Sequence, residues 1–207
     1  MSFLQDYITI KGESTAEYSE KHSRFIATCF FCESEQQAGE IIAVQKSKYW
    51  DARHNVYAYV LQNGTARFSD DGEPHGTAGM PILEVIKGSG VTNLLIVVTR
   101  YFGGILLGTG GLVRAYTQAA QRAVASAEIL SYSLCVDLSI EVDYPLYDKL
   151  MNICSTRGAK VMDTQYTDKV FVKVRMISGT QTDLVNDIEI LTKGRKPDVS
   201  EEIYDIF

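Results

Sequence analysis

Three carboxylates lie within four positions of the segment SDDGEPHGTAGMP, residues 69–81: Asp70, Asp71 and Glu73. Carboxylate oxygens are hard ligands that suit Mg²⁺ or Ca²⁺, so the cluster is a candidate magnesium site, although its spacing is not that of an EF-hand. The same residues could instead belong to a loop that leads into a helix. Their charge would then lie near the positive end of the helix dipole, and Asp71 or Thr77 would cap the helix.

A second candidate is the glycine-rich segment TRYFGGILLGTGGLVRAY, residues 99–116. Its glycines allow left-handed turns, and successive backbone amides of such a loop can bind an anion at the start of a helix. The glycines are Gly103, Gly104, Gly108, Gly110 and Gly111. Arg100 and Arg114 flank the loop and could bind a phosphate or carboxylate through two parallel hydrogen bonds. The spacing matches neither a Walker A loop nor a Rossmann fingerprint, and a purely structural loop is the alternative.

The two segments carry opposite charges. If Asp70, Asp71 and Glu73 pair directly with Arg100 and Arg114, the repulsion among the carboxylates is relieved without any ligand. Such pairing would make the two segments one surface.

The other reactive side chains favour structural roles. Cys29 and Cys32 lie three apart on a predicted strand, so they point to opposite faces and are poorly placed to share a metal. His54 could act as a base, but no serine or cysteine nucleophile motif accompanies it, which favours a hydrogen-bonded structural histidine. Trp50 ends a predicted helix, where we expect it to pack against the core or its edge.

Hydrophobic periodicity and turn residues predict two successive α+β patterns. In the first, strands are predicted at 7–13, 23–32, 54–62, 66–70 and 92–100, and helices at 34–50 (capped by Ser34), 76–90 and 112–129. In the second, strands at 133–142, 159–167, 169–177 and 196–207 alternate with helices at 144–158 and 180–194. This βαββαβ order is that of the ferredoxin-like motif, and it predicts a domain boundary near residues 130–133.

Composition narrows the class of protein. The chain has 207 residues and a net charge of −6, so it lacks the basic excess of a protein held to nucleic acid mainly through phosphates, and we expect no DNA partner. The longest apolar run, LLIVV at 94–98, is too short to span a bilayer, and the N-terminus does not resemble a signal peptide. Four cysteines in a chain of this length do not indicate a disulfide framework. We expect a cytoplasmic protein without membrane partners, with a monomer favoured.

Together, the segments FSDDGEPHGTAGMPILEVI and VVTRYFGGILLGTGGLVRAYTQA resemble the IMPACT/YigZ family of bacterial and eukaryotic proteins. The stretches KHSRFIA (21–27) and ARHNVYAY (52–59) add to the resemblance. It implies an α+β protein of two domains: residues 1–131 with a ribosomal protein S5 domain 2-like fold, and residues 132–207 with a ferredoxin-like fold similar to a domain of elongation factor G. Eukaryotic members of the family regulate translation. No catalytic residues are established for the family, so none is carried over.

The resemblance and the residues together favour a binding protein over an enzyme. We expect a translation-associated regulator that contacts a protein, an RNA or a ribosome-associated factor through the two segments. The candidate contact residues are Asp70, Asp71, Glu73, Thr77, Arg100, Gly103, Gly104, Gly108, Gly110, Gly111, Arg114 and His54. The alternative is a nucleotide-binding protein or enzyme in which the glycine loop holds phosphate and the carboxylates hold Mg²⁺. If RNA binds the ferredoxin-like sheet, Tyr166 and Phe171 are the candidate stacking residues.

Overall fold

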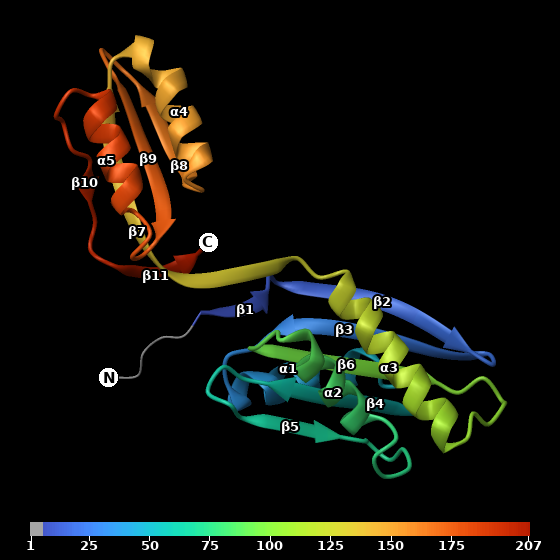
Figure 1. The fold of residues 1–207 in the computed structure, drawn as a ribbon. Coiled ribbons are helices and arrows are strands. Elements are labelled where there is room, and N and C mark those ends of the chain that lie inside the picture. The colour runs from blue at the N-terminus through green and yellow to red at the C-terminus, as the bar shows by residue number, and fades with distance from the viewer. Residues whose placement is uncertain (1–5) are drawn as a thin grey trace. The chain divides into compact units, whose positions relative to one another are not determined.

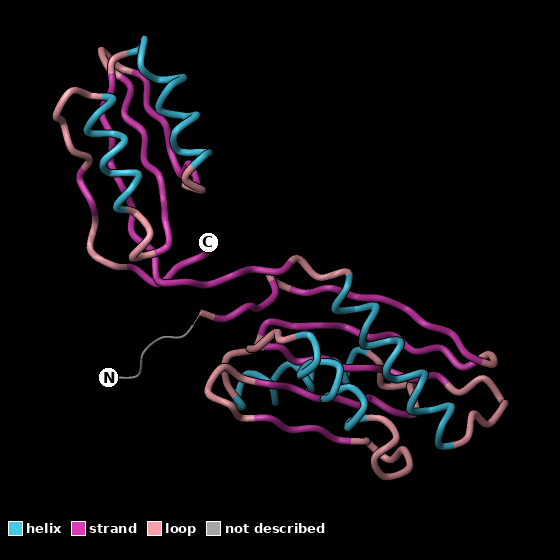
Figure 2. Tube along the Cα trace, in the orientation of Figure 1, coloured by secondary structure: helices cyan, strands magenta, loops and turns pink. Residues whose placement is uncertain are grey.

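The computed structural model describes residues 6–207, which divide into an N-terminal unit, Tyr7–Leu130, and a C-terminal unit that contains Ser131–Phe207. Figure 1 shows the helices and strands of each unit, and Figure 2 shows the same chain by secondary structure. Both units combine helices with antiparallel sheets, so the predicted α+β fold with two domains is confirmed. Among the described residues, no helix is long and apolar enough to cross a membrane.

The N-terminal unit is built on an antiparallel sheet. Its strands lie in the order β2 (Glu13–Glu20), β3 (Ser23–Phe31), β6 (Leu94–Tyr101), β4 (His54–Val60) and β5 (Ala66–Ser69). Helices α2 (Gly79–Ser89) and α3 (Thr109–Ala125) cover one face, and α1 (Glu35–Lys48) packs on the other. The short strand β1 (Tyr7–Ile10) precedes them and forms a parallel bridge from Ile8 to Val91.

The central strand β6 explains why the sheet is covered on both faces. All of its residues except Tyr101 are buried, which is typical of a strand packed on two sides. Leu94, Ile96 and Val98 contribute to the core under α2 and α3, whereas Leu95 and Val97 contribute to the core under α1. Helix α3 approaches the sheet closely because the residues that it buries are mostly alanines.

The structure confirms some sequence predictions for this unit and corrects others. Strand β2 was not predicted, because its sequence ESTAEYSE is polar and only every second residue is partly buried at this sheet edge. Helix α1 is confirmed, with Ser34 accepting a hydrogen bond from the backbone of Gln37 at 3.2 Å. Helix α2 begins at Gly79, so Pro81 lies in its first turn, where proline is tolerated. Trp50 does not pack into the core, since 82% of its surface is exposed.

The C-terminal unit has the predicted βαββαβ order. Strand β7 (Ile129–Val142) begins four residues earlier than predicted and is followed by the short 3₁₀ helix η1 (Tyr144–Leu146), α4 (Tyr147–Thr156), β8 (Lys160–Tyr166), β9 (Val170–Ile177) and α5 (Thr182–Leu191). The predicted last strand is broken into β10 (Asp198–Val199) and β11 (Ile203–Ile206), both paired antiparallel with β7. Helices α4 and α5 bury one face of this sheet, through Leu150, Cys154, Leu184 and Ile188.

Candidate functional site

The carboxylate of Asp70 caps helix α2 from outside the helix. It accepts hydrogen bonds from the backbone N–H groups of Gly76 at 2.8 Å, Ala78 at 3.1 Å and Gly79 at 2.8 Å. These donors precede or begin α2, where backbone N–H groups have no partner within the helix. The expectation of a cap by Asp71 or Thr77 is therefore wrong, and the hydroxyl of Thr77 donates to the carbonyl of Pro74 instead.

Asp71 binds two neighbours with its two carboxylate oxygens. Oδ1 lies 2.6 Å from Lys46 Nζ, and Oδ2 accepts the backbone N–H of Asn55 at 2.7 Å. The carbonyl oxygen of Asp71 lies 2.8 Å from His54 Nδ1. Because a carbonyl can only accept, Nδ1 of His54 carries the proton in this contact. His54 therefore has the hydrogen-bonded structural role that its sequence context favoured.

Glu73 is the most deeply buried of the three carboxylates. Its Oε1 accepts hydrogen bonds from Arg100 Nη1 at 2.6 Å and from the hydroxyl of Tyr116 at 2.8 Å, and His54 Nε2 lies 3.9 Å away. The predicted pairing of carboxylates with arginines is confirmed for Glu73 and Arg100. It is wrong for Arg114, which forms no ion pair with any described residue and lines a separate cavity of about 380 Å³.

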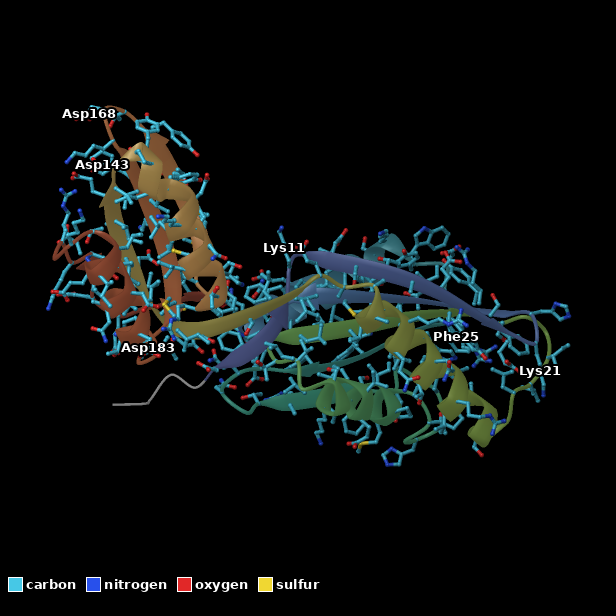
Figure 3. All side chains as sticks on the ribbon, turned by 45° about the horizontal axis from the view of Figure 1, so that its top comes forward. Lys11, Lys21, Phe25, Asp143, Asp168 and Asp183 are labelled. Atoms are coloured by element: carbon cyan, nitrogen blue, oxygen red, sulfur yellow. The ribbon has the colours of Figure 1, made fainter. Side chains whose placement is uncertain are left out.

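Arg100 is an arginine held inside the fold. Only 6% of its surface is exposed, and its guanidinium carbon lies 5.5 Å from the ring centre of Phe25 and 5.7 Å from that of Phe102. Phe25, labelled in Figure 3, also makes an edge-to-face contact with Tyr116 at 5.1 Å. Burial, together with the neighbouring charge of Glu73, raises the pKa of Tyr116 above its ordinary value. The Nε atom of Arg100 is buried and has no hydrogen-bond partner among the described residues.

The glycine-rich loop packs against the turn that joins β2 to β3. Lys21, labelled at this turn in Figure 3, and His22 both have positive φ angles. Gly103 lies so close that an added Cβ would be 2.0 Å from the carbonyl carbon of His22, and its N–H donates to Ser23 Oγ at 3.2 Å. Gly103 is thus required for close packing.

The remaining glycines shape the start of helix α3. Gly104 and Gly108 have φ angles of 84° and 70°, the left-handed region that favours glycine. Gly110 and Gly111 lie in the first turn of α3, and no side chain caps this helix at Gly108. The first N–H groups of α3 are therefore available to an anion, as the sequence pattern suggested.

A cavity of about 400 Å³ lies between the two loops. It is lined by Arg53, His54, Gly72, Glu73, Pro74, Arg100, Phe102, Leu106, Leu107, Gly108, Thr109 and Leu112. The predicted residues His54, Glu73, Arg100 and Gly108 thus meet at one site. Asp70, Asp71 and Thr77 belong to the first loop, and Gly103, Gly104, Gly110 and Gly111 belong to the second loop and the start of α3, whereas Arg114 lies at the separate cavity.

Large apolar side chains at this cavity were missed from the sequence. Phe102 is 42% exposed and Leu106 is 82% exposed, and the neighbouring Ile105 is 45% exposed. Tyr116, whose hydroxyl donates to Glu73, is not among the predicted site residues. The local sequence could not have separated Leu106 from the adjacent Leu107, because Leu106 is exposed whereas Leu107 packs against the N-terminal core.

The magnesium interpretation stays a prediction. The three carboxylates bind different partners, and the described residues contain no group of three or more His, Cys, Asp or Glu side chains arranged to hold a metal ion.

In the C-terminal unit, the two predicted stacking residues lie on opposite faces of the sheet. Tyr166 is paired in register with the buried Val170, and its hydroxyl donates to that of Tyr147 on α4, so it lies on the face that carries the helices. Phe171 is adjacent to Val170 on β9 and therefore points to the other face. These two rings do not form one stacking platform.

Comparisons with known proteins identify both domains. The Impact N-terminal domain matches residues 21–124, and a domain of unknown function, DUF1949, matches residues 140–195. An IMPACT family member of Haemophilus influenzae is 42% identical over 199 residues, 93% of this chain and 95% of the relative. The IMPACT family member YigZ of Escherichia coli is 32% identical over 75% of this chain and 78% of its own length. A solved structure described as that of a hypothetical protein is 27% identical, with a TM-score of 0.61 over 95% of this chain and 97% of that one.

Proposed function

Because the chain belongs to the IMPACT family, we propose that it is a cytoplasmic regulator associated with translation, which acts by binding a protein partner at the cavity between its two loops. Family membership supports the link to translation. The single observation that carries the site is the cavity itself, where the two family segments meet around a buried ion pair and expose apolar side chains.

The exposed rim of the cavity favours a protein partner. Leu106 and Phe102 present apolar surface beside the charged floor, and exposed apolar groups next to polar ones are typical of protein interfaces. RNA is less well matched, because the chain carries a net charge of −6 and Tyr166 and Phe171 do not share a face.

Binding rather than catalysis also fits the state of the cysteines. All four are buried, and burial raises the pKa of each thiol, to about 12 for Cys29 and about 11 for Cys154. A thiol with a raised pKa is a poor source of the nucleophilic thiolate.

The proposal is tested by adding the purified chain to a bacterial cell-free translation system and measuring the rate of reporter synthesis. We expect the wild-type chain to change the rate and Leu106→Ala to lose most of this effect. Ile190→Ala is the matched control, because Ile190 is 77% exposed but belongs to the C-terminal unit. No effect of the wild-type chain, or equal losses in both variants, would contradict the proposal.

A further inference from the structure

Helices α2 and α3 leave a groove between them at the surface of the N-terminal unit. The two helices pack side by side on one face of the sheet (Figure 1). The groove between them has a volume of about 770 Å³. It shares no lining residue with the cavity between the two loops, so it is a separate surface.

Apolar side chains line the α2–α3 groove although it lies at the surface. They are Met80, Pro81, Val85, Val113 and Val124. Met80 is 39% exposed and Val113 is 37% exposed. Neighbouring exposed apolar side chains that are bordered by polar ones are typical of a protein-binding surface.

The groove has the length of a short helix. Its lining extends from Met80 to Ser89 on α2 and from Val113 to Ala125 on α3. At the rise of an α-helix these spans are about 14 Å and about 18 Å, which corresponds to about three helical turns. Gly88 also lines the groove, and a Cβ added there would meet no atom within 4 Å. A helix in the groove can therefore approach α2 closely at Gly88.

Positive charge borders the groove along α3. This helix contains Arg114 and Arg122 but no acidic residue. Each arginine directly follows a residue that lines the groove, Val113 or Gln121. Neither arginine forms an ion pair with a described residue, and the guanidinium carbon of Arg122 lies 4.9 Å from the ring centre of Tyr18. Both charges are therefore available to a partner.

The acidic side chains nearby already have partners. Glu84, which lines the groove on α2, pairs with Lys87 at 3.4 Å. Glu20 lies at the neighbouring cavity with Arg114, and its carboxylate accepts a hydrogen bond from the hydroxyl of Tyr18 at 2.9 Å. The two helices together carry three basic residues and one acidic residue, an excess of two positive charges in a chain of net charge −6. This local excess favours an acidic partner.

We propose that the α2–α3 groove binds an acidic amphipathic helix of a partner protein. The apolar face of that helix lies in the groove, and its acidic residues lie beside Arg114 and Arg122. The apolar lining, the length of about three turns and the positive border all match a helix that binds through one apolar face. The groove is thus a second contact surface, independent of the cavity in the proposed function.

The test uses the full chain labelled with ¹⁵N and three peptide probes of about 14 residues, which is long enough to span the groove. The acidic probe is acetyl-(Leu-Glu-Ala-Leu-Leu-Ala-Glu)₂-amide, and glutamine or lysine replaces every glutamate in the neutral and basic probes. We expect the acidic probe to shift the backbone amides of residues 80–89 and 113–125. The neutral probe should bind about threefold more weakly and the basic probe at least about tenfold more weakly, with smaller differences at high salt. Equal binding of the three probes, or shifts confined to other residues, would overturn the inference.

Gly88→Leu fills the groove and leaves the fold intact. The added side chain enters open space at an exposed position, and leucine favours a helix more than glycine does, so the midpoint of thermal unfolding should not fall. Binding of the acidic probe should weaken at least about tenfold, because the new side chain clashes with the bound helix. Gly39→Leu is the matched control, since Gly39 is an exposed glycine with open space on α1. Equal binding by the two variants would contradict the proposal.

Two further measurements separate the role of charge and the identity of the partner. Arg114→Gln/Arg122→Gln should bind the acidic and neutral probes equally, and a preference for the acidic probe that survives in this variant would contradict the role of the arginines. Sedimentation equilibrium shows whether a second copy of the chain fills the groove. We expect Gly88→Leu to leave the mass in solution unchanged. A wild-type dimer that Gly88→Leu abolishes would overturn the proposal, because the groove would then bind another copy.

Discussion

Removal of the positive charge at Arg100 should lower the midpoint of thermal unfolding of the N-terminal unit. Arg100 and Glu73 are joined at 2.6 Å, and only 7% and 4% of their side-chain surfaces are exposed. Arg100→Met leaves the Glu73 carboxylate buried without its cation, and breaking a buried pair in this way costs about 3–5 kcal/mol. For a chain of this size, such a loss lowers the midpoint of thermal unfolding by roughly 10 °C.

The measurement is thermal and urea unfolding followed by far-UV circular dichroism, with hydrogen exchange of the β6 amides to assign the loss to the N-terminal unit. The double variant Arg100→Met/Glu73→Gln removes both charges and should be more stable than Arg100→Met alone. Arg24→Met is the matched control, because Arg24 pairs with Glu17 at the surface, where both side chains are 52% exposed, and we expect no measurable change. The reasoning fails if Arg100→Met costs less than about 1 kcal/mol, or if the double variant is less stable than the single one.

Three further predictions follow from the same unit. Gly103→Ala should displace the glycine-rich loop and lower the free energy of unfolding in urea by about 2 kcal/mol, because its Cβ would meet backbone atoms of His22. Gly39→Ala is the control and should not destabilise the chain, because Gly39 lies on α1 with open space around it. Equal effects of the two substitutions would refute the packing role. Asp70→Ala should lower the free energy of unfolding by about 2 kcal/mol and speed hydrogen exchange of the first amides of α2, since three backbone donors lose their acceptor. Unchanged exchange would contradict the capping role. Burial raises the pKa of Cys29 from about 9 to about 12, so the unfolded chain loses this proton first as pH rises. The contribution of Cys29 to stability should therefore be complete below pH 9 and be lost between pH 9 and 12. The stability of Cys29→Ala should fall less steeply over this range. Equal urea midpoints of the wild-type chain at about pH 7.5 and 10.5 would refute this prediction.

The sequence predicted the elements whose residues are buried in a regular pattern. Hydrophobic periodicity predicts the strand at 92–100 and the helix at 112–129, which correspond to β6 and α3, because burial selects the side chains along the whole element. Strand β2 was missed because an edge strand with one exposed face needs few apolar residues. The prediction that Trp50 packs on the core or its edge rests on its residue type and its place at the end of a helix, and neither shows whether the side chain turns toward the core.

The site was predicted in outline but not in detail. The residue types indicated that carboxylates and arginines meet, and Glu73 and Arg100 do so. Which carboxylate pairs with which arginine depends on strand register and on the path of the loops. Neither can be read from the few residues around each side chain. Asp70 caps a helix that begins nine positions later, and Arg114 points to another cavity, so spacing along the chain could not separate their roles.

Site-specific photocrosslinking tests the central claim, that the cavity between the two loops is where a partner binds. Leu106→p-benzoylphenylalanine and Ile190→p-benzoylphenylalanine place the same photoreactive group at positions of similar exposure, 82% and 77%. After irradiation in bacterial cells, crosslinked proteins are identified by mass spectrometry. The account predicts that a protein of the translation machinery crosslinks to position 106 and not to position 190. Crosslinks to that machinery from position 190 alone, or equally from both positions, would contradict it.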